Sequence, residues 1–147
     1  MSATTRVLVA RLGHERIAID VAVLAEVLDA PEIQPLPLVP PGVLGQLGWR
    51  GGFVPVLDPG VLLGVPRSAQ PGRGAALVLR DVGAALWVDD AEDVWAPEEA
   101  ERRPVPAGSD RLGVLRALLA RGDDVVAHVD APALVAAVST TLRQGPL

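Results

Sequence analysis

The chain of 147 residues lacks cysteine, lysine and tyrosine, and it has one phenylalanine. Without cysteine it can form no disulfide and no thiolate metal site. Without lysine it cannot contain the phosphate-binding loop whose lysine reaches the nucleotide phosphates. No Gly-x-Ser-x-Gly motif is present, and the serines lie in terminal or linker-like contexts. These absences argue against a nucleophilic triad and against nucleotide chemistry.

Excess positive charge is also missing. The net charge is -5, and the basic residues, all arginine, are scattered along the chain. Nucleic-acid binding needs clustered basic residues, so no nucleic-acid partner is expected. The uncharged run from Ile33 to Trp49 is broken by proline and glycine, and the N-terminus carries Arg6 and Arg11. We therefore expect no membrane insertion, no secretory leader and a cytoplasmic location.

Short strands dominate what is present. Half of the residues are hydrophobic and 21% are charged, as in a globular domain. Turn signals recur every eight to twelve residues and predict nine or ten strands, which is typical of an all-β barrel or sandwich. The predicted strands are Thr5–Leu12, Arg16–Ile19, Ile33–Leu38 at an edge, Val43–Arg50, Phe53–Leu57, Ala75–Arg80, Ala84–Asp89, Asp93–Ala96, Leu112–Leu119 and Val125–Val129.

Three short helices are predicted between the strands. Asp20 can cap a helix over Val21–Val27, although a strand ending at Glu26-Val27-Leu28 is the alternative. Asp58 and Pro59 predict a short helix that ends at Gly64. Asp130 and Pro132 predict a terminal helix over Ala131–Val138.

The region from Leu36 to Gly64 is the most informative part of the chain. Its prolines and glycines exclude a long helix, and Arg50 and Asp58 are its only formal charges. Val43–Arg50 and Phe53–Leu57 predict a hairpin that turns at Gly51-Gly52. Arg50 thus lies at a tight turn between apolar strands, where it can meet a partner outside the domain.

Other candidate residues have less specific patterns. Asp89, Asp90, Glu92 and Asp93 form an acidic cluster that lacks calcium-loop spacing, and we interpret it as a solvated strand end. His14 and His128 are expected to be structural or exposed. Three tryptophans, at positions 49, 87 and 95, are interpreted as core and interface side chains. A barrel that binds or transforms a small molecule through these tryptophans and the cluster at Asp89 is the alternative function.

The chain resembles the CheW-like family, the coupling proteins of bacterial chemotaxis. The most specific match is to the family signature Gly-Val-x-Asn-Leu-Arg-Gly-x-x-x-Pro-Val-x-Asp-Leu. The matching motifs here are Leu12-Gly13-x-Glu15-Arg16-Ile17-Ala18-Ile19, Leu24-x-Glu26-Val27, Pro37-x-x-Pro40, Gly45-x-x-x-x-Arg50-Gly51-x-x-Val54-Pro55-Val56-Leu57-Asp58, Leu62-Leu63-Gly64, Val88-Asp89-x-x-x-x-Val94, and Gly113 through Val129-Asp130-x-x-x-Leu134.

This resemblance implies one CheW-like domain of two packed, five-stranded, SH3-like barrels. The first barrel would span residues 13–72, with a linker at Arg67–Arg73. The second would comprise residues 73–138 and the N-terminal strand, followed by a tail at 139–147.

The resemblance also implies a non-enzymatic adaptor without a cofactor or metal. Its partners would be the regulatory domain of the chemotaxis histidine kinase and the cytoplasmic tip of a chemoreceptor, so the protein would be recruited to membrane receptor arrays. The protein-binding residues implied are Arg50, Trp49, Gly51, Leu24, Glu26 and Val27.

The sequence departs from the family pattern at three places. Gly48-Trp49 replaces Asn-Leu before the arginine, Pro59-Gly60 follows Asp58, and His128 occupies a position where an apolar residue is common. A tryptophan beside Arg50 could add an anchor for binding or indicate a changed partner. A CheW-like domain of another motility or developmental system is thus a further interpretation.

Overall fold

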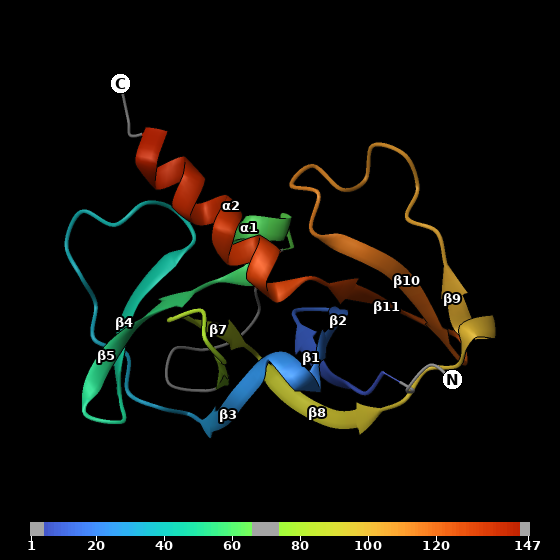
Figure 1. Ribbon diagram of the computed structural model, residues 1–147, viewed down its shortest axis with the longest axis horizontal. Coiled ribbons are helices and arrows are strands. Elements are labelled where there is room, and N and C mark those ends of the chain that lie inside the picture. The colour runs from blue at the N-terminus through green and yellow to red at the C-terminus, as the bar shows by residue number, and fades with distance from the viewer. Residues whose placement is uncertain (1–4, 66–73, 145–147) are drawn as a thin grey trace.

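The computed structural model describes residues 5–65 and 74–144, with side chains as far as Val138 in the second range. The predicted linker, Arg67–Arg73, lies outside the described residues. The mainly β fold is confirmed: the described residues form two sheets, whose strand pairs are mostly antiparallel, and two α-helices (Figure 1).

One sheet has six strands in the order β8-β1-β2-β11-β10-β9, and the other has five in the order β3-β6-β7-β5-β4. The six-stranded sheet comprises β1 (Val7–Leu12), β2 (Glu15–Asp20), β8 (Asp90–Trp95), β9 (Arg102–Arg103), β10 (Leu115–Arg121) and β11 (Asp124–Val129). The five-stranded sheet comprises β3 (Leu24–Asp29), β4 (Val43–Trp49), β5 (Gly52–Leu57), β6 (Ala75–Leu79) and β7 (Ala85–Val88).

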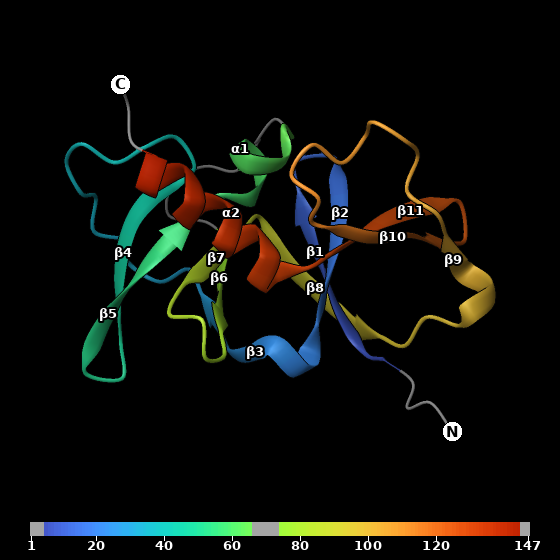
Figure 2. The ribbon, with the colours of Figure 1, turned by 45° about the horizontal axis from the view of Figure 1, so that its top comes forward.

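The two sheets repeat one topology. In each, a hairpin (β4–β5 or β10–β11) adds its second strand in parallel to a central strand, β7 or β2. In each, an edge strand with a bulge, β3 or β8, pairs with β6 or β1. A helix follows each hairpin: α1 (Pro59–Leu63) after β5 and α2 (Ala131–Gln144) after β11 (Figure 2). We call these units the five-stranded half and the six-stranded half.

The predicted division of the chain near residue 72 does not match the sheets. β6 and β7 follow that boundary but pair with β3 and β5, and the whole N-terminal hairpin β1–β2 joins the six-stranded half. Pairings between strands that are distant in the sequence decide which sheet each strand joins, and the pattern of residues within a strand does not predict those pairings. Among the described residues no backbone ladder closes either sheet into a barrel.

Helix caps predicted from sequence are confirmed where the helix exists. Asp58 Oδ1 accepts hydrogen bonds from the amides of Gly60 (2.9 Å) and Val61 (3.4 Å), and Gly64 ends α1 with φ 75°. Asp130 Oδ1 accepts from the Ala133 amide at 3.1 Å at the start of α2. α2 continues past the predicted end at Val138 to Gln144.

The predicted helix over Val21–Val27 is wrong, and the alternative strand is correct. Only Val21–Val23 form a 3-10 turn, after which β3 pairs with β6. Asp20 makes no capping hydrogen bond there. The helical spacing of apolar residues was misleading because a short apolar run fits both the helix period and the strand period. The backbone of β3 instead forms its hydrogen bonds with β6, which is distant in the sequence.

Three other predicted strands have different bounds in the structure. Ile33–Leu38 contributes only one bridge, Gln34 to Gln46, because alternate prolines lack the N–H that a ladder needs. A Cβ at Gly45 would collide with the Gln34 carbonyl, so this bridge also requires that glycine. β8 begins at Asp90 and β10 at Leu115, and the unpredicted elements η2 (Glu99–Glu101) and β9 lie in the connection between them.

The largest apolar cluster is shared between the halves. It contains Leu8 and Ile19 from the six-stranded sheet, Leu77 and Leu86 from the five-stranded sheet, and Leu134 from α2. Each sheet also curls around a smaller cluster of its own. One contains Val9, Leu119 and Val126 in the six-stranded half, and the other contains Leu47, Val56 and Trp87 in the five-stranded half.

Candidate protein-binding surface

The turn of the β4–β5 hairpin places Arg50 at its tip. Trp49 pairs with Gly52, which leaves a two-residue turn of Arg50 (φ 49°) and Gly51 (φ 79°). Positive φ at both central residues is the type I′ turn that tight hairpins prefer. The predicted turn at Gly51-Gly52 is thus shifted by one residue. Glycine relieves one of the two left-handed positions, and Arg50 adopts the other at some conformational cost.

The guanidinium of Arg50 is exposed and stacks on the neighbouring indole. Its Cζ lies 4.6 Å from the centroid of the Trp49 ring. No carboxylate of the described residues lies within ion-pair distance of Arg50. Stacking restricts the orientation of the cation without neutralising it. Arg50 therefore presents hydrogen-bond donors that no carboxylate of the described residues neutralises, and its stacking on Trp49 favours one orientation.

Glu26 holds the other edge of the Trp49 indole. Trp49 Nε1–H donates to Glu26 Oε1 at 3.1 Å. Glu26 is on β3 and Trp49 on β4, which are the two opposite edges of the five-stranded sheet. The side chains meet because the sheet curls, so tertiary structure joins two motifs that lie 23 residues apart.

The remaining predicted residues separate into surface and core. Val27 is 43% exposed on β3, and Gly51 is exposed at the turn. Leu24, by contrast, is buried in the shared core. Val56 and Leu57, from the same motif as Arg50, are also buried.

Two exposed apolar side chains of this half were missed at the level of sequence. Phe53 is 62% exposed and is the second residue of β5. Its position was predictable, since alternation on a strand with Val54 and Val56 turned inward sends Phe53 outward. Leu38 is fully exposed and has φ 59°, which only its tertiary setting reveals.

A hollow of about 460 Å³ lies beside Arg50. Arg80 and Asp81, from the turn between β6 and β7, line it together with Trp49, Arg50 and Val54. Arg80 Nη2 donates to the Leu24 carbonyl at 3.1 Å, so its guanidinium is anchored at the rim. The tip of the β4–β5 hairpin and the hollow beside it thus combine apolar area with several charged side chains, which is typical of protein-binding surfaces.

The acidic cluster of Asp89, Asp90, Glu92 and Asp93 was predicted to be a solvated strand end, and this is wrong for Asp89. Asp89 is buried, and its Oδ2 accepts from the Gly13 amide at 2.6 Å, which fixes the β1–β2 turn. Glu92 pairs with Arg16 at 2.7 Å and Asp93 with Arg121 at 2.6 Å. Hydrogen bonding to Glu92 raises the pKa of Arg16. Among the described residues no group of three acidic, histidine or cysteine side chains could hold a metal ion.

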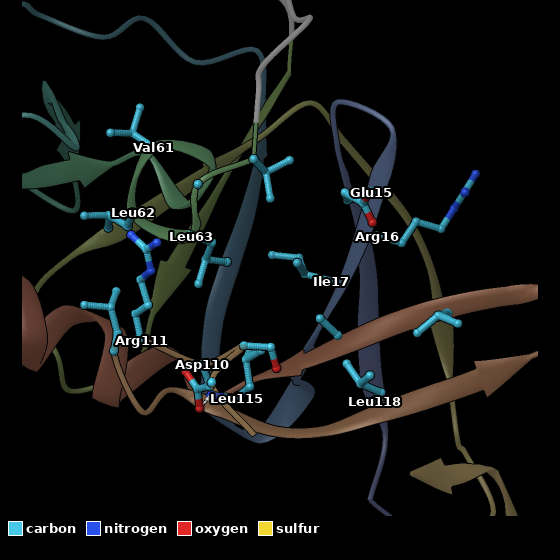
Figure 3. A pocket seen from close by; sticks show the side chains of 17 residues that line it. Glu15, Arg16, Ile17, Val61, Leu62, Leu63, Asp110, Arg111, Leu115 and Leu118 are labelled. Carbon is cyan, nitrogen blue, oxygen red and sulfur yellow. Dashed lines mark hydrogen bonds between the residues drawn. The ribbon is translucent and has the colours of Figure 1, made fainter. Parts of the chain in front are cut away.

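A larger groove than this hollow lies elsewhere, between α1, the loop at 108–112 and strands β2, β10 and β11 (Figure 3). It has a volume of about 780 Å³, an apolar floor that includes Ile17, Leu115 and Leu118, and Arg111 at its rim. No tryptophan lines this groove, and no member of the acidic cluster lines either this groove or the hollow beside Arg50, where Trp49 is the one tryptophan. The alternative of a small-molecule barrel built on those residues is therefore not supported.

No helix among the described residues is both long and apolar enough to cross a membrane. His14 is exposed in the β1–β2 turn, whereas His128 is buried in the six-stranded half.

Comparison with known proteins agrees with this architecture. The chain is 26% identical over 99 residues to the chemotaxis protein CheW of Rhizobium meliloti (strain 1021), which covers 65% of this chain and 63% of that protein. The crystal structure of the scaffolding protein TtCheW from Thermoanaerobacter tengcongensis superposes with a TM-score of 0.76, at 20% identity, over 88% of this chain and 86% of that one.

The family model for the CheW-like domain matches residues 6–139, which include both sheets and the start of α2. This range also contains the Arg50 hairpin and Glu26. The chain belongs to the CheW-like family.

Proposed function

We propose that this protein is a non-enzymatic adaptor that couples chemoreceptors to the chemotaxis histidine kinase through protein–protein contacts. Membership of the CheW-like family supports the role, and the relatives matched are named as a chemotaxis and a scaffolding protein. The observation that carries the proposal is the free, oriented guanidinium of Arg50 at the tip of a rigid hairpin.

The chemistry of the hairpin favours a partner with a carboxylate. A guanidinium offers a planar fork that binds both oxygens of an aspartate or glutamate. Because Trp49 and the hairpin already orient Arg50, little side-chain entropy is lost on binding. Phe53, exposed on the outward face of the same hairpin, supplies apolar area that a partner covering that face would remove from water.

The partners proposed are the regulatory domain of the kinase and the cytoplasmic tip of the receptor. Arg50, Trp49 and Gly51 form one part of the surface, and Glu26 and Val27 on β3 extend it. We place the protein in the cytoplasm, recruited to membrane receptor arrays by these contacts.

Charge reversal at Arg50 tests the proposal. Arg50→Glu is expected to weaken binding to the kinase regulatory domain or to a receptor-tip fragment by about 1–4 kcal/mol, as loss of an interface hot spot does. The fold should persist, since the side chain is exposed. Titration calorimetry measures the affinity, and circular dichroism checks the fold.

Arg111→Glu is the matched control, because Arg111 is also exposed and makes no ion pair with the described residues. It should leave both affinities unchanged. Equal affinity of wild type and Arg50→Glu for both partners would contradict the proposed role.

A further inference from the structure

A buried histidine in the six-stranded half is joined to two charged side chains. His128 lies on β11, two residues after Val126, and is 1% exposed. Its Nε2 is 2.6 Å from Asp20 Oδ1 at the end of β2, and its Nδ1 is 3.4 Å from Arg102 Nη1 at the start of β9. One imidazole thus links three strands of the sheet.

The arginine determines which ring nitrogen carries the proton. A guanidinium can only donate, so Nδ1 must accept from Arg102. The hydrogen of the neutral ring is then on Nε2 and is donated to Asp20. The result is a directed chain from Arg102 through His128 to Asp20, which requires a neutral imidazole.

Further charges surround this chain. Arg116 Nη1, on β10, lies 3.8 Å from Asp20 Oδ2, and Arg116 Nη2 is 3.3 Å from Asp130 Oδ2. Glu99 Oε2, in η2, lies 3.9 Å from Arg102 Nε. Asp20 therefore has a second cationic partner, whereas Arg102 depends on His128 and on the exposed side chain of Glu99.

Arg102 belongs to the least supported element of the sheet. β9 has two residues, and only the pairs Leu118–Arg103 and Leu119–Arg102 join it to β10. Such a short edge strand has little backbone pairing of its own. The contact between Arg102 and His128 adds a side-chain link from this edge to the interior.

We propose that His128, Arg102 and Asp20 form a pH-sensitive latch that holds η2 and β9 against the sheet. A protonated imidazole carries hydrogens on both nitrogens, so it cannot accept from Arg102 and repels that cation. It keeps its bond to Asp20, now as an ion pair. Acidification therefore releases the Arg102 side and leaves the interior of the half in place.

Amide hydrogen exchange of the intact chain at about pH 7.5 and about pH 5.5 spans the range in which imidazole changes charge. Protection factors, which correct for the pH dependence of the exchange chemistry, should fall about tenfold for residues 99–103 at the lower pH, the order expected when one hydrogen bond is lost. The Val56 and Leu86 amides of the five-stranded half should keep their protection.

His128→Gln tests the origin of the effect, because a glutamine carbonyl can accept from Arg102 and its amide can donate to Asp20 without titrating. The variant should hold residues 99–103 at both pH values, while the control His14→Gln should behave as wild type. If His128→Gln does not fold, Arg102→Gln replaces it and should be open at both pH values. Equal protection of wild type at both pH values, or a pH response retained in the folded variant, would overturn the latch.

Discussion

The five-stranded and six-stranded halves share a topology, but different side-chain contacts fill the space beside their parallel strand pairs. In the register of the parallel strands, Val56 pairs with Ala85 in one half and His128 with Ala18 in the other. Two residues after these alanines come Trp87 and Asp20, respectively. An apolar contact in the five-stranded half is thus replaced by a hydrogen-bonded histidine and aspartate at the same place in the six-stranded half. The same backbone tolerates either solution, provided that each buried polar atom has a partner.

The tips of the β4–β5 and β10–β11 hairpins also differ in their side-chain contacts. An acidic side chain of the bulged edge strand reaches the tip in both halves: Glu26 binds Trp49, and Asp93 binds Arg121. In the six-stranded half the carboxylate neutralises the guanidinium, which also stacks on Trp95 at 4.8 Å. In the five-stranded half the carboxylate takes the indole N–H instead. Among the described carboxylates none pairs with Arg50, so its guanidinium remains available for a partner.

The largest effect on stability is expected in the five-stranded half, where the contact beside the parallel strand pair is apolar. Trp87→Ala should lower the free energy of unfolding by about 3–5 kcal/mol, because it empties a large buried volume. Urea denaturation measures the loss. Trp95→Ala is the control and should cost less, since Trp95 is only half-buried. Equal losses would mean that the two halves do not differ in this way.

A smaller effect on stability is expected in the six-stranded half, where the corresponding contact is polar. Asp20→Ala should cost about 1–3 kcal/mol near pH 7, because it leaves the buried Nε2–H of His128 without its acceptor. Asp29→Ala, at an exposed position on β3, should change the free energy of unfolding by less than about 0.5 kcal/mol. Thermal and urea unfolding would show this, and a neutral Asp20→Ala would indicate that the cluster adds no stability.

The smallest effect is expected at the paired hairpin tip. Hydrogen bonding from Arg121 lowers the pKa of Asp93 below its ordinary 3.8. The pair therefore stabilises the fold above that value, and the contribution disappears as pH falls through the lowered one. Asp93→Asn should cost about 0.2–1 kcal/mol near pH 7, because both side chains are partly exposed.

The difference between Asp93→Asn and wild type should shrink as the pH falls through the lowered pKa of Asp93, where wild type loses the same charge. Scanning calorimetry across this range measures it. Asp123→Asn, at an exposed position in the same hairpin, is the control. A difference that stays constant down to low pH would assign the effect to something other than the ion pair.

Local sequence signals predicted the parts of the fold that depend on local chemistry. The hairpins, the caps at Asp58 and Asp130, and the end of α1 at Gly64 are confirmed because turn and cap residues act within a few positions. Predictions failed where a distant strand competes. β3 is a strand because β6 satisfies its backbone, and Asp89 is buried because the Gly13 amide needs an acceptor.

The candidate site was partly predictable in the same sense. Arg50, Glu26 and Val27 could be singled out from motifs. Their geometry could not, because the contact between Glu26 and Trp49 joins the two edges of a curled sheet. Phe53 was accessible to a strand-alternation argument, whereas the exposure of Leu38 was not.

By itself, the sequence determined the mainly β character, the turns and caps, and the family to which the chain belongs. Only the tertiary structure decided which strands share a sheet, that Asp89 is buried, and that Arg50 stacks on Trp49 without a carboxylate partner among the described residues. The physical reason is range: turn and cap energies act over a few residues, whereas pairing and burial depend on segments that are distant in the chain and meet only after folding.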